Sequence, residues 1–153
     1  MRGLAFVFSA GCLLAAYSLS GPATGQPSTP KGQHDNRFTL RVCNYSKVRD
    51  VGIALMTWTE QGRWRFHGWY EVLDDECYDQ GSYLRPSFYF HARGGGHSWG
   101  SNDTRQCINP KRENFDRVVG FEGYRCAGRN DIAVGFGRRE MSADRSIFVL
   151  NLR

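Results

Sequence analysis

The stretch WRFHGWYEVLDDEC, residues 64–77, decides the fold that we predict for this chain. The aromatic residues at its first and third positions alternate with Arg65 and His67. This alternation is typical of a strand with one apolar face and one wet face. We therefore expect a core strand that begins at Trp64 and presents Arg65 and His67 to solvent.

The second half of the stretch contains a glycine break and an acidic turn. Gly68 interrupts the alternation, and a glycine inside a strand predicts a β-bulge. Residues 74–76 are all acidic, so their charges repel one another unless water solvates them. We expect an exposed turn there, with Cys77 directly behind it.

Further strands are predicted on both sides by the same period of two. We expect a polar link after Cys77, turns at 109–110 and 128–130, and a loop at 93–97, where three successive glycines disfavour regular structure. No amphipathic helical window exceeds about three turns. The pattern predicts an all-β fold, a single antiparallel β-sandwich or open barrel. The further predicted strands are 38–43, 51–58, 87–92, 105–108, 115–121, 131–137 and 146–151.

The N-terminus reads as an export signal ahead of one domain. Arg2 precedes a nearly unbroken apolar or small stretch at 4–19, and small residues follow it. We predict a signal peptide at 1–25, a flexible leader at 26–36 and a single disulfide-stabilised β domain at 37–153. The protein is then exported, periplasmic or extracellular, with no membrane span after cleavage. An uncleaved anchor is the alternative, although about 16 weakly apolar residues fall short of the usual span of about 20.

Four cysteines remain after the predicted signal peptide, namely Cys43, Cys77, Cys107 and Cys126. An even number in an exported chain predicts two disulfides. Three connectivities are possible. Proximity in the chain favours Cys107 with Cys126, which leaves Cys43 with Cys77, but the sequence leaves the connectivity open. There is no C-x-x-C spacing, so we expect neither a metal site nor a cofactor.

The charge balance argues against a nucleic-acid partner. The chain has 20 basic and 15 acidic residues, and the two kinds are interleaved along the sequence. A nucleic-acid surface requires basic residues that cluster. We therefore expect no nucleic-acid partner. The sequence carries no signal for the oligomeric state.

The order of several short motifs resembles a known family. The motifs are Val42-Cys43-Asn44, Trp58 at a strand end, Gly68-Trp69-Tyr70, Glu76-Cys77, Phe88-Tyr89-Phe90-His91-Ala92, a glycine-rich loop with Trp99, Gln106-Cys107-Ile108 and Cys126. Together they resemble the small exported bacterial proteins of domain of unknown function 1036, over about 38–136. The chain departs from that pattern at Asp74, Asp75 and His91 and continues beyond its usual end. The resemblance implies an exported bacterial protein defined by paired cysteines and tryptophans, and it brings no activity.

Two catalytic interpretations of the sequence are less favoured than simpler ones. Residues 96–100 match the G-x-S-x-G pattern around Ser98, but that motif needs a helix after the serine and a histidine later in the chain, and every histidine precedes Ser98. His67, His91 and His97 lack metal-ligand spacing. The two strand histidines are more simply residues of a polar face.

The tryptophans give the candidate ligand surface. Trp69 follows a glycine break and Trp99 lies in the glycine-rich loop with His97 and Arg93. Exposed aromatic rings beside such residues suit stacking on a sugar, a peptide or a lipid headgroup. The alternative is that Trp99 folds back as a lid over the end of the sandwich. We expect a non-enzymatic binding or interaction module of the cell envelope, whose partner is an envelope component or another protein. The alternative is a small secreted hydrolase with an unlocated His/carboxylate site.

Overall fold

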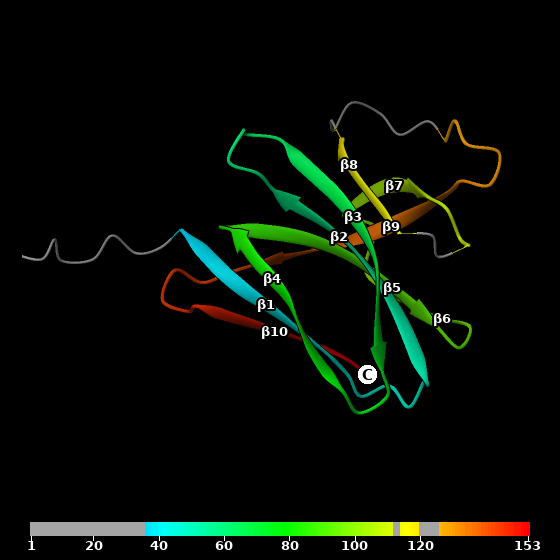
Figure 1. Cartoon of the computed structure of the whole chain (residues 1–153), viewed down its shortest axis with the longest axis horizontal. Helices are drawn as coiled ribbons and strands as arrows, with labels where there is room; N and C mark the ends of the chain where they lie inside the picture. The colour runs from blue at the N-terminus through cyan, green and yellow to red at the C-terminus, as the bar shows by residue number, and fades with distance from the viewer. Residues whose placement is uncertain (1–35, 112–113, 120–125) are drawn as a thin grey trace, which may run out of the picture. The chain divides into compact units, whose positions relative to one another are not determined.

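The computed structural model describes residues 36–111, 114–119 and 126–153. The predicted signal peptide and all of the predicted leader except its last residue lie outside this range. Every regular element in the described part is a β-strand (Figure 1), which confirms the all-β prediction. The strands are β1 (Arg37–Asn44), β2 (Asp50–Trp58), β3 (Trp64–Leu73), β4 (Cys77–Leu84), β5 (Ser87–Gly94), β6 (His97–Trp99), β7 (Thr104–Ile108), β8 (Phe115–Val119), β9 (Ile132–Glu140) and β10 (Ile147–Leu152).

The strands form two sheets. The smaller sheet has the order β10-β1-β4, and the larger has the order β7-β9-β5-β2-β3-β8 with β6 paired to β5. The larger sheet is curled like half of a barrel (Figure 1). Antiparallel pairing dominates as predicted, but β1 and β10 pair in parallel. A tight turn forces the two strands that it joins to pair antiparallel. No such turn joins β1 and β10, because they come from opposite ends of the described chain, so they are able to pair in parallel.

The main core lies between the two sheets. Large apolar side chains from both sheets pack there, and a second cluster lies on the opposite, concave face of the larger sheet. Each face of the larger sheet is therefore apolar, which explains why β2 is buried along nearly its whole length. The inter-sheet core includes Phe38, Leu40, Val42, Ile53, Leu55, Phe88, Phe90 and Leu150, and the second cluster includes Met56, Phe66, Trp69, Ile108 and Phe136.

The predicted bulge in β3 is confirmed. Ile53 of β2 pairs with Tyr70 and Ala54 pairs with Gly68, so Trp69 is the extra residue. A Cβ atom at Gly68 would lie 2.9 Å from the Cα atom of Ala54, so only glycine allows this approach. The bulge resets the alternation of β3, and it turns Trp69 toward the concave face.

Three local predictions were wrong. The polar link after Cys77 is strand β4, whose side chains are mostly exposed and therefore show no hydrophobic alternation. The predicted loop at 93–97 is a hairpin in which only Gly95 and Gly96 form the turn; their φ values of 54° and 81° suit a two-residue hairpin turn. His67 and His91 are buried rather than solvent-exposed.

Two disulfides cross-link the domain, as predicted. Cys43 and Cys77 are directly opposite each other on β1 and β4, with a Cα–Cα distance of 4.0 Å. Cys107 of β7 is bonded to Cys126, with a Cα–Cα distance of 5.2 Å. The first bridge fixes the register at one end of the smaller sheet. This is the connectivity that chain proximity favoured.

Candidate functional site

An open groove of about 830 Å³ lies at the side of the molecule where β3 and β8 of the larger sheet face β4 of the smaller one. We call it the seam groove. Its lining combines aromatic rings with carboxyl and amide groups, and none of the described residues that line it is a lysine, arginine or histidine. The lining residues are Gly68, Trp69, Tyr70, Glu71, Tyr78, Asp79, Gln80, Asn114, Phe115 and Asp116.

Two arginines hold the aspartates of the seam groove in fixed orientations. The Arg41 guanidinium donates to both carboxylate oxygens of Asp79, at 2.6 and 2.9 Å. Arg65 makes the same two-pronged contact with Asp116, with 2.8 Å between Nε and Oδ1. These hydrogen bonds lower the pKa of both aspartates. Each carboxylate therefore stays ionised and keeps lone pairs that can accept further hydrogen bonds.

His67 follows Arg65 by two positions on β3 and is buried. His67 Nε2 is 3.1 Å from the hydroxyl of Thr57, and Nδ1 is 2.7 Å from the hydroxyl of Tyr70. Burial, reinforced by the charge of Arg65, lowers the pKa of His67 to about 4. The imidazole is therefore neutral at pH 7, and both of its nitrogens are occupied by neighbouring hydroxyls.

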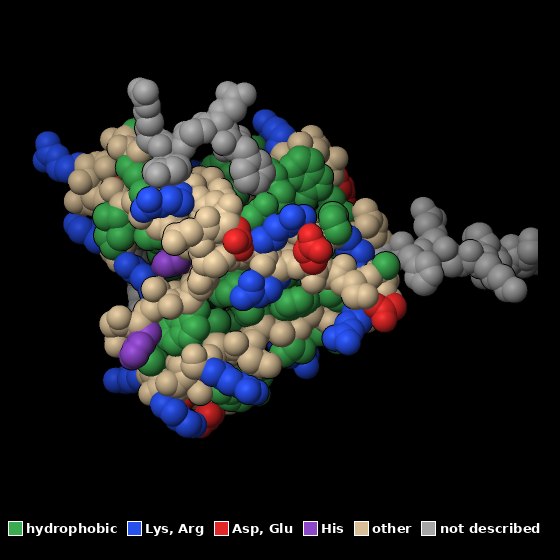
Figure 2. Space-filling model, turned by 180° about the vertical axis from the view of Figure 1, so that it is seen from behind, with side chains coloured by type: hydrophobic (Ala, Val, Ile, Leu, Met, Phe, Trp, Pro, Cys, Tyr) green, Lys and Arg blue, Asp and Glu red, His purple; other side chains and the backbone are tan. Residues whose placement is uncertain are grey.

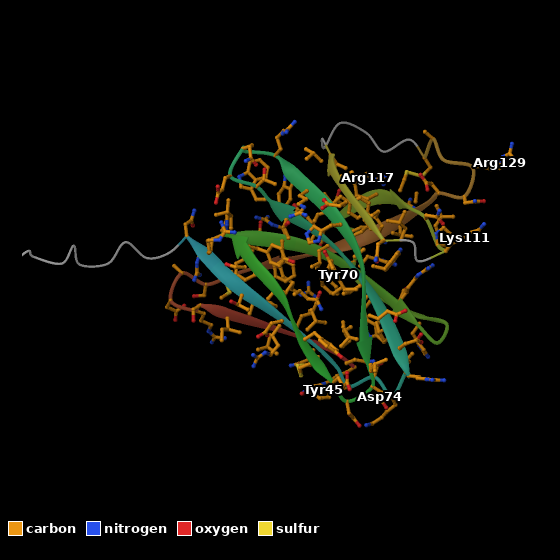
Figure 3. All side chains as sticks on the ribbon, in the orientation of Figure 1. Tyr45, Tyr70, Asp74, Lys111, Arg117 and Arg129 are labelled. Carbon is orange, nitrogen blue, oxygen red and sulfur yellow. A yellow bond between two sulfur atoms is a disulfide. The ribbon has the colours of Figure 1, made fainter. Side chains whose placement is uncertain are left out.

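The bulge in β3 makes this histidine–tyrosine pair possible. In a regular strand, residues three positions apart point to opposite faces. The extra residue Trp69 places Tyr70 on the same face as His67, and Figure 3 shows Tyr70 in the space between the sheets. Burial raises the pKa of Tyr70, so its hydroxyl stays protonated. The site residues His67 and Tyr70 thus depend on the glycine that permits the bulge.

A second, smaller cleft lies beside the β5–β6 hairpin. It has a volume of about 450 Å³ and includes two of the predicted ligand residues, Arg93 and His97. The Arg93 guanidinium stacks 4.6 Å from the centre of the Trp69 ring and donates a hydrogen bond to the carbonyl of Pro110. The other lining residues are His91, Gly94, Gly95, Gly96, Ser98, Ile132 and Val134.

The four predicted ligand residues do not share one surface. Trp69 is only 4% exposed, and its indole N–H donates to the carbonyl of Asn109 at 3.2 Å, so its ring offers no open stacking face. Trp99 is half-buried against the inter-sheet core and donates to the carbonyl of Arg153 at 2.8 Å. His97 is exposed, with its ring 6.2 Å from that of Trp99. Trp99 therefore contributes to the packing of the inter-sheet core.

The structure does not place the described residues as the two catalytic interpretations require. Ser98 lies in the short strand β6 of a hairpin, and the next described element is strand β7 rather than a helix, so residues 96–100 do not form a nucleophile elbow. His91 is buried, and its Nδ1 lies 2.9 Å from the carbonyl of Gly135. Within the described residues, no three His, Cys, Asp or Glu side chains are placed to hold a metal ion.

Sequence reasoning missed the seam groove because its residues come from three strands without a shared motif. Tyr78 and Asp79 lie on β4, which the sequence did not reveal as a strand, and Asp116 lies on β8. The pairing of Arg41 with Asp79 follows from the register of β1 on β4. The cysteines were the one available signal, because in an antiparallel pair a Cys43–Cys77 bridge places residue 79 directly opposite residue 41.

The chain matches no family model, and comparison with the curated proteins and with the solved structures finds no match. In the part that the structure describes, no helix has the length and apolar character needed to cross a membrane.

Proposed function

We propose that this chain is an exported binding module of the cell envelope that holds its partner in the seam groove. The observation that carries the proposal is the groove itself, where aromatic rings lie beside carboxylates that arginines keep ionised and oriented. Two disulfides support an exported location, since such bonds persist in oxidising compartments. We also propose that the chain belongs to the family of domain of unknown function 1036.

Binding is favoured over hydrolysis because the histidines are poorly placed for proton transfer. A general base needs an imidazole nitrogen within reach of a substrate. Both nitrogens of His67 are taken by Thr57 and Tyr70, and His91 is buried among aromatic rings. His97 is exposed, and the centre of its ring lies 6.2 Å from that of the Trp99 ring. A hydrolase using these residues is the less favoured alternative.

The chemistry of the seam groove suits a ligand rich in hydroxyl or amine donors. The carboxylates of Asp79, Asp116 and Glu71 are hydrogen-bond acceptors, while Tyr78 and Phe115 supply ring surface. Ordered acceptors beside aromatic rings provide orientation and apolar contact together. A carbohydrate of the envelope presents such donors and matching apolar ring faces.

The test compares two tyrosines of nearly equal exposure. Tyr78 lines the groove and is 45% exposed, whereas Tyr45 lies outside the lining and is 42% exposed. The purified chain is sedimented with envelope fragments, and the bound fraction is measured for each variant. We expect Tyr78→Ser to lower binding about tenfold, which corresponds to roughly 1.4 kcal/mol, and Tyr45→Ser to leave it unchanged.

Two results would overturn the proposal. One is equal binding by both variants and the unchanged chain, and the other is an equal loss in both variants with unaltered thermal melts. Pretreating the fragments with glycan-degrading enzymes or with protease then distinguishes a carbohydrate from a protein ligand.

A further inference from the structure

The last strand of the chain lies at the edge of the smaller sheet. Strand β10 pairs with β1 and, in the described residues, with no other strand. Figure 1 shows β10 in red on the outer side of β1. An edge strand presents backbone N–H and C=O groups that another strand can pair with.

The hydrogen bonds to β1 show which backbone groups point outward. The N–H of Thr39 donates to the carbonyl of Ser146, and the N–H of Tyr45 donates to the carbonyl of Leu152, each at 2.8 Å. In a parallel ladder the residues that face the partner alternate along the strand. The even-numbered residues of β10 therefore face β1. The backbone groups of Ile147, Val149 and Asn151 face the open edge.

The side chains of this edge are unusually apolar. Ile147 and Val149 are 46% and 47% exposed, and 147–152 contains no charged residue. The strands at the other ends of the two sheets carry charge: Asp79 on β4, Arg105 on β7, and Asp116 with Arg117 on β8. The three-residue strand β6, which pairs with β5, carries no acidic residue, lysine or arginine. Charges on an edge strand protect it from pairing with another chain. Strand β10 lacks that protection.

We propose that β10 pairs with β10 of a second copy of this chain, antiparallel and centred on Val149. In this register Val149 faces Val149 of the other copy as a hydrogen-bonded pair, and Ile147 faces Asn151. All of these residues direct their backbone groups to the open edge, so the register satisfies both strands. The exposed apolar side chains become neighbours across the twofold axis, and the paired residues 147–151 carry no charge. The next odd-numbered pair at each end places Arg145 opposite Arg153. The two small sheets join into one continuous sheet.

The test uses two valines of similar exposure on two different edges. Val149→Lys brings two lysines face to face at the proposed axis, whereas Val118→Lys adds the same charge to β8, where Val118 is 50% exposed. Sedimentation equilibrium measures the dimer dissociation constant of the purified chain. We expect the constant to rise at least a hundredfold for Val149→Lys and to change less than threefold for Val118→Lys.

Amide exchange provides an independent measurement on the unchanged chain. Exchange at Ile147, Val149 and Asn151 is expected to slow as protein concentration rises, while exchange at Val118 stays constant. A chain that remains monomeric at millimolar concentration overturns the proposal. So does a Val149→Lys variant that dimerises as strongly as the unchanged chain.

Discussion

At the scale of single residues, His67 makes stability depend on pH. Its pKa is about 4 in the folded chain and about 6.5 when unfolded, so the unfolded state binds more protons between these values. Stability should therefore fall by about 3 kcal/mol as the pH drops from about 6.5 to about 4, with little further loss from His67 below that. Burial also lowers the pKa of His91, which adds to the loss at acid pH.

His67→Gln isolates the contribution of His67, because glutamine does not titrate and keeps hydrogen-bonding groups. Urea unfolding of both proteins at pH 7 and pH 4 gives the measurement. We expect the variant to lose less stability on acidification than the unchanged chain. Equal losses would show that protonation of His67 does not control acid unfolding. Asp79 and Asp116 do not contribute to this difference in stability between pH 7 and pH 4. Their pKa values are lowered in the folded chain, so their protonation changes the stability only below about pH 4.

Asn44 is a second buried residue whose side-chain donors and acceptor all have hydrogen-bond partners. It is fully buried, and its amide group donates to the carbonyls of Val48 and Val72 while its oxygen accepts from Ser46. Asn44→Asp would replace these donors by an acceptor or a charge facing two carbonyls. We expect a loss of about 3 kcal/mol or more at pH 7, measured by urea unfolding. Ser46→Ala is the milder control, because both donations by Asn44 remain.

At the scale of elements, we expect the Cys43–Cys77 disulfide to contribute a large part of the free energy that holds β4 against β1. Strand β4 is mostly exposed, so it has few buried side chains to hold it in the sheet. The Cys43–Cys77 bridge closes a loop with a sequence separation of 34 residues, for which the chain-entropy model gives about 4 kcal/mol. Replacing both cysteines by alanine should lower the melting temperature by more than 10 °C. A melt within 2 °C of the unchanged chain would contradict this expectation.

The elements also show how far sequence reasoning reached. Strands with many buried apolar side chains, such as β1, β2 and β5, were predicted nearly to their ends, because an apolar run of this length marks a covered strand in the sequence. Strand β4 was missed because its position is fixed by pairing and a disulfide rather than by burial. His67 was expected in solvent, because one strand does not reveal that a second sheet covers its face. The seam groove was beyond prediction for the same reason.

At the scale of the whole molecule, the parallel pair of β1 and β10 joins the two ends of the described chain. Leu150 and Leu152 of β10 are buried in the inter-sheet core, and Phe148 packs against Phe88 with ring centres 5.2 Å apart. Removing 147–153 would expose this core and leave β1 with one neighbour. Burial of large apolar side chains contributes about 1.5 to 3 kcal/mol each. The total approaches the whole stability of a small domain.

We therefore expect the chain that ends at residue 146 to lose its cooperative thermal melt. The control is Ile147→Ser with Val149→Ser, which keeps the backbone of β10 and changes only exposed side chains; it should melt within a few degrees of the unchanged chain. Circular dichroism in the near ultraviolet follows the packing of the buried aromatic rings in each protein. A truncated chain that keeps a cooperative melt and a native aromatic signal would show that the larger sheet folds without β10, and that the smaller sheet is an addition to it rather than half of a shared core.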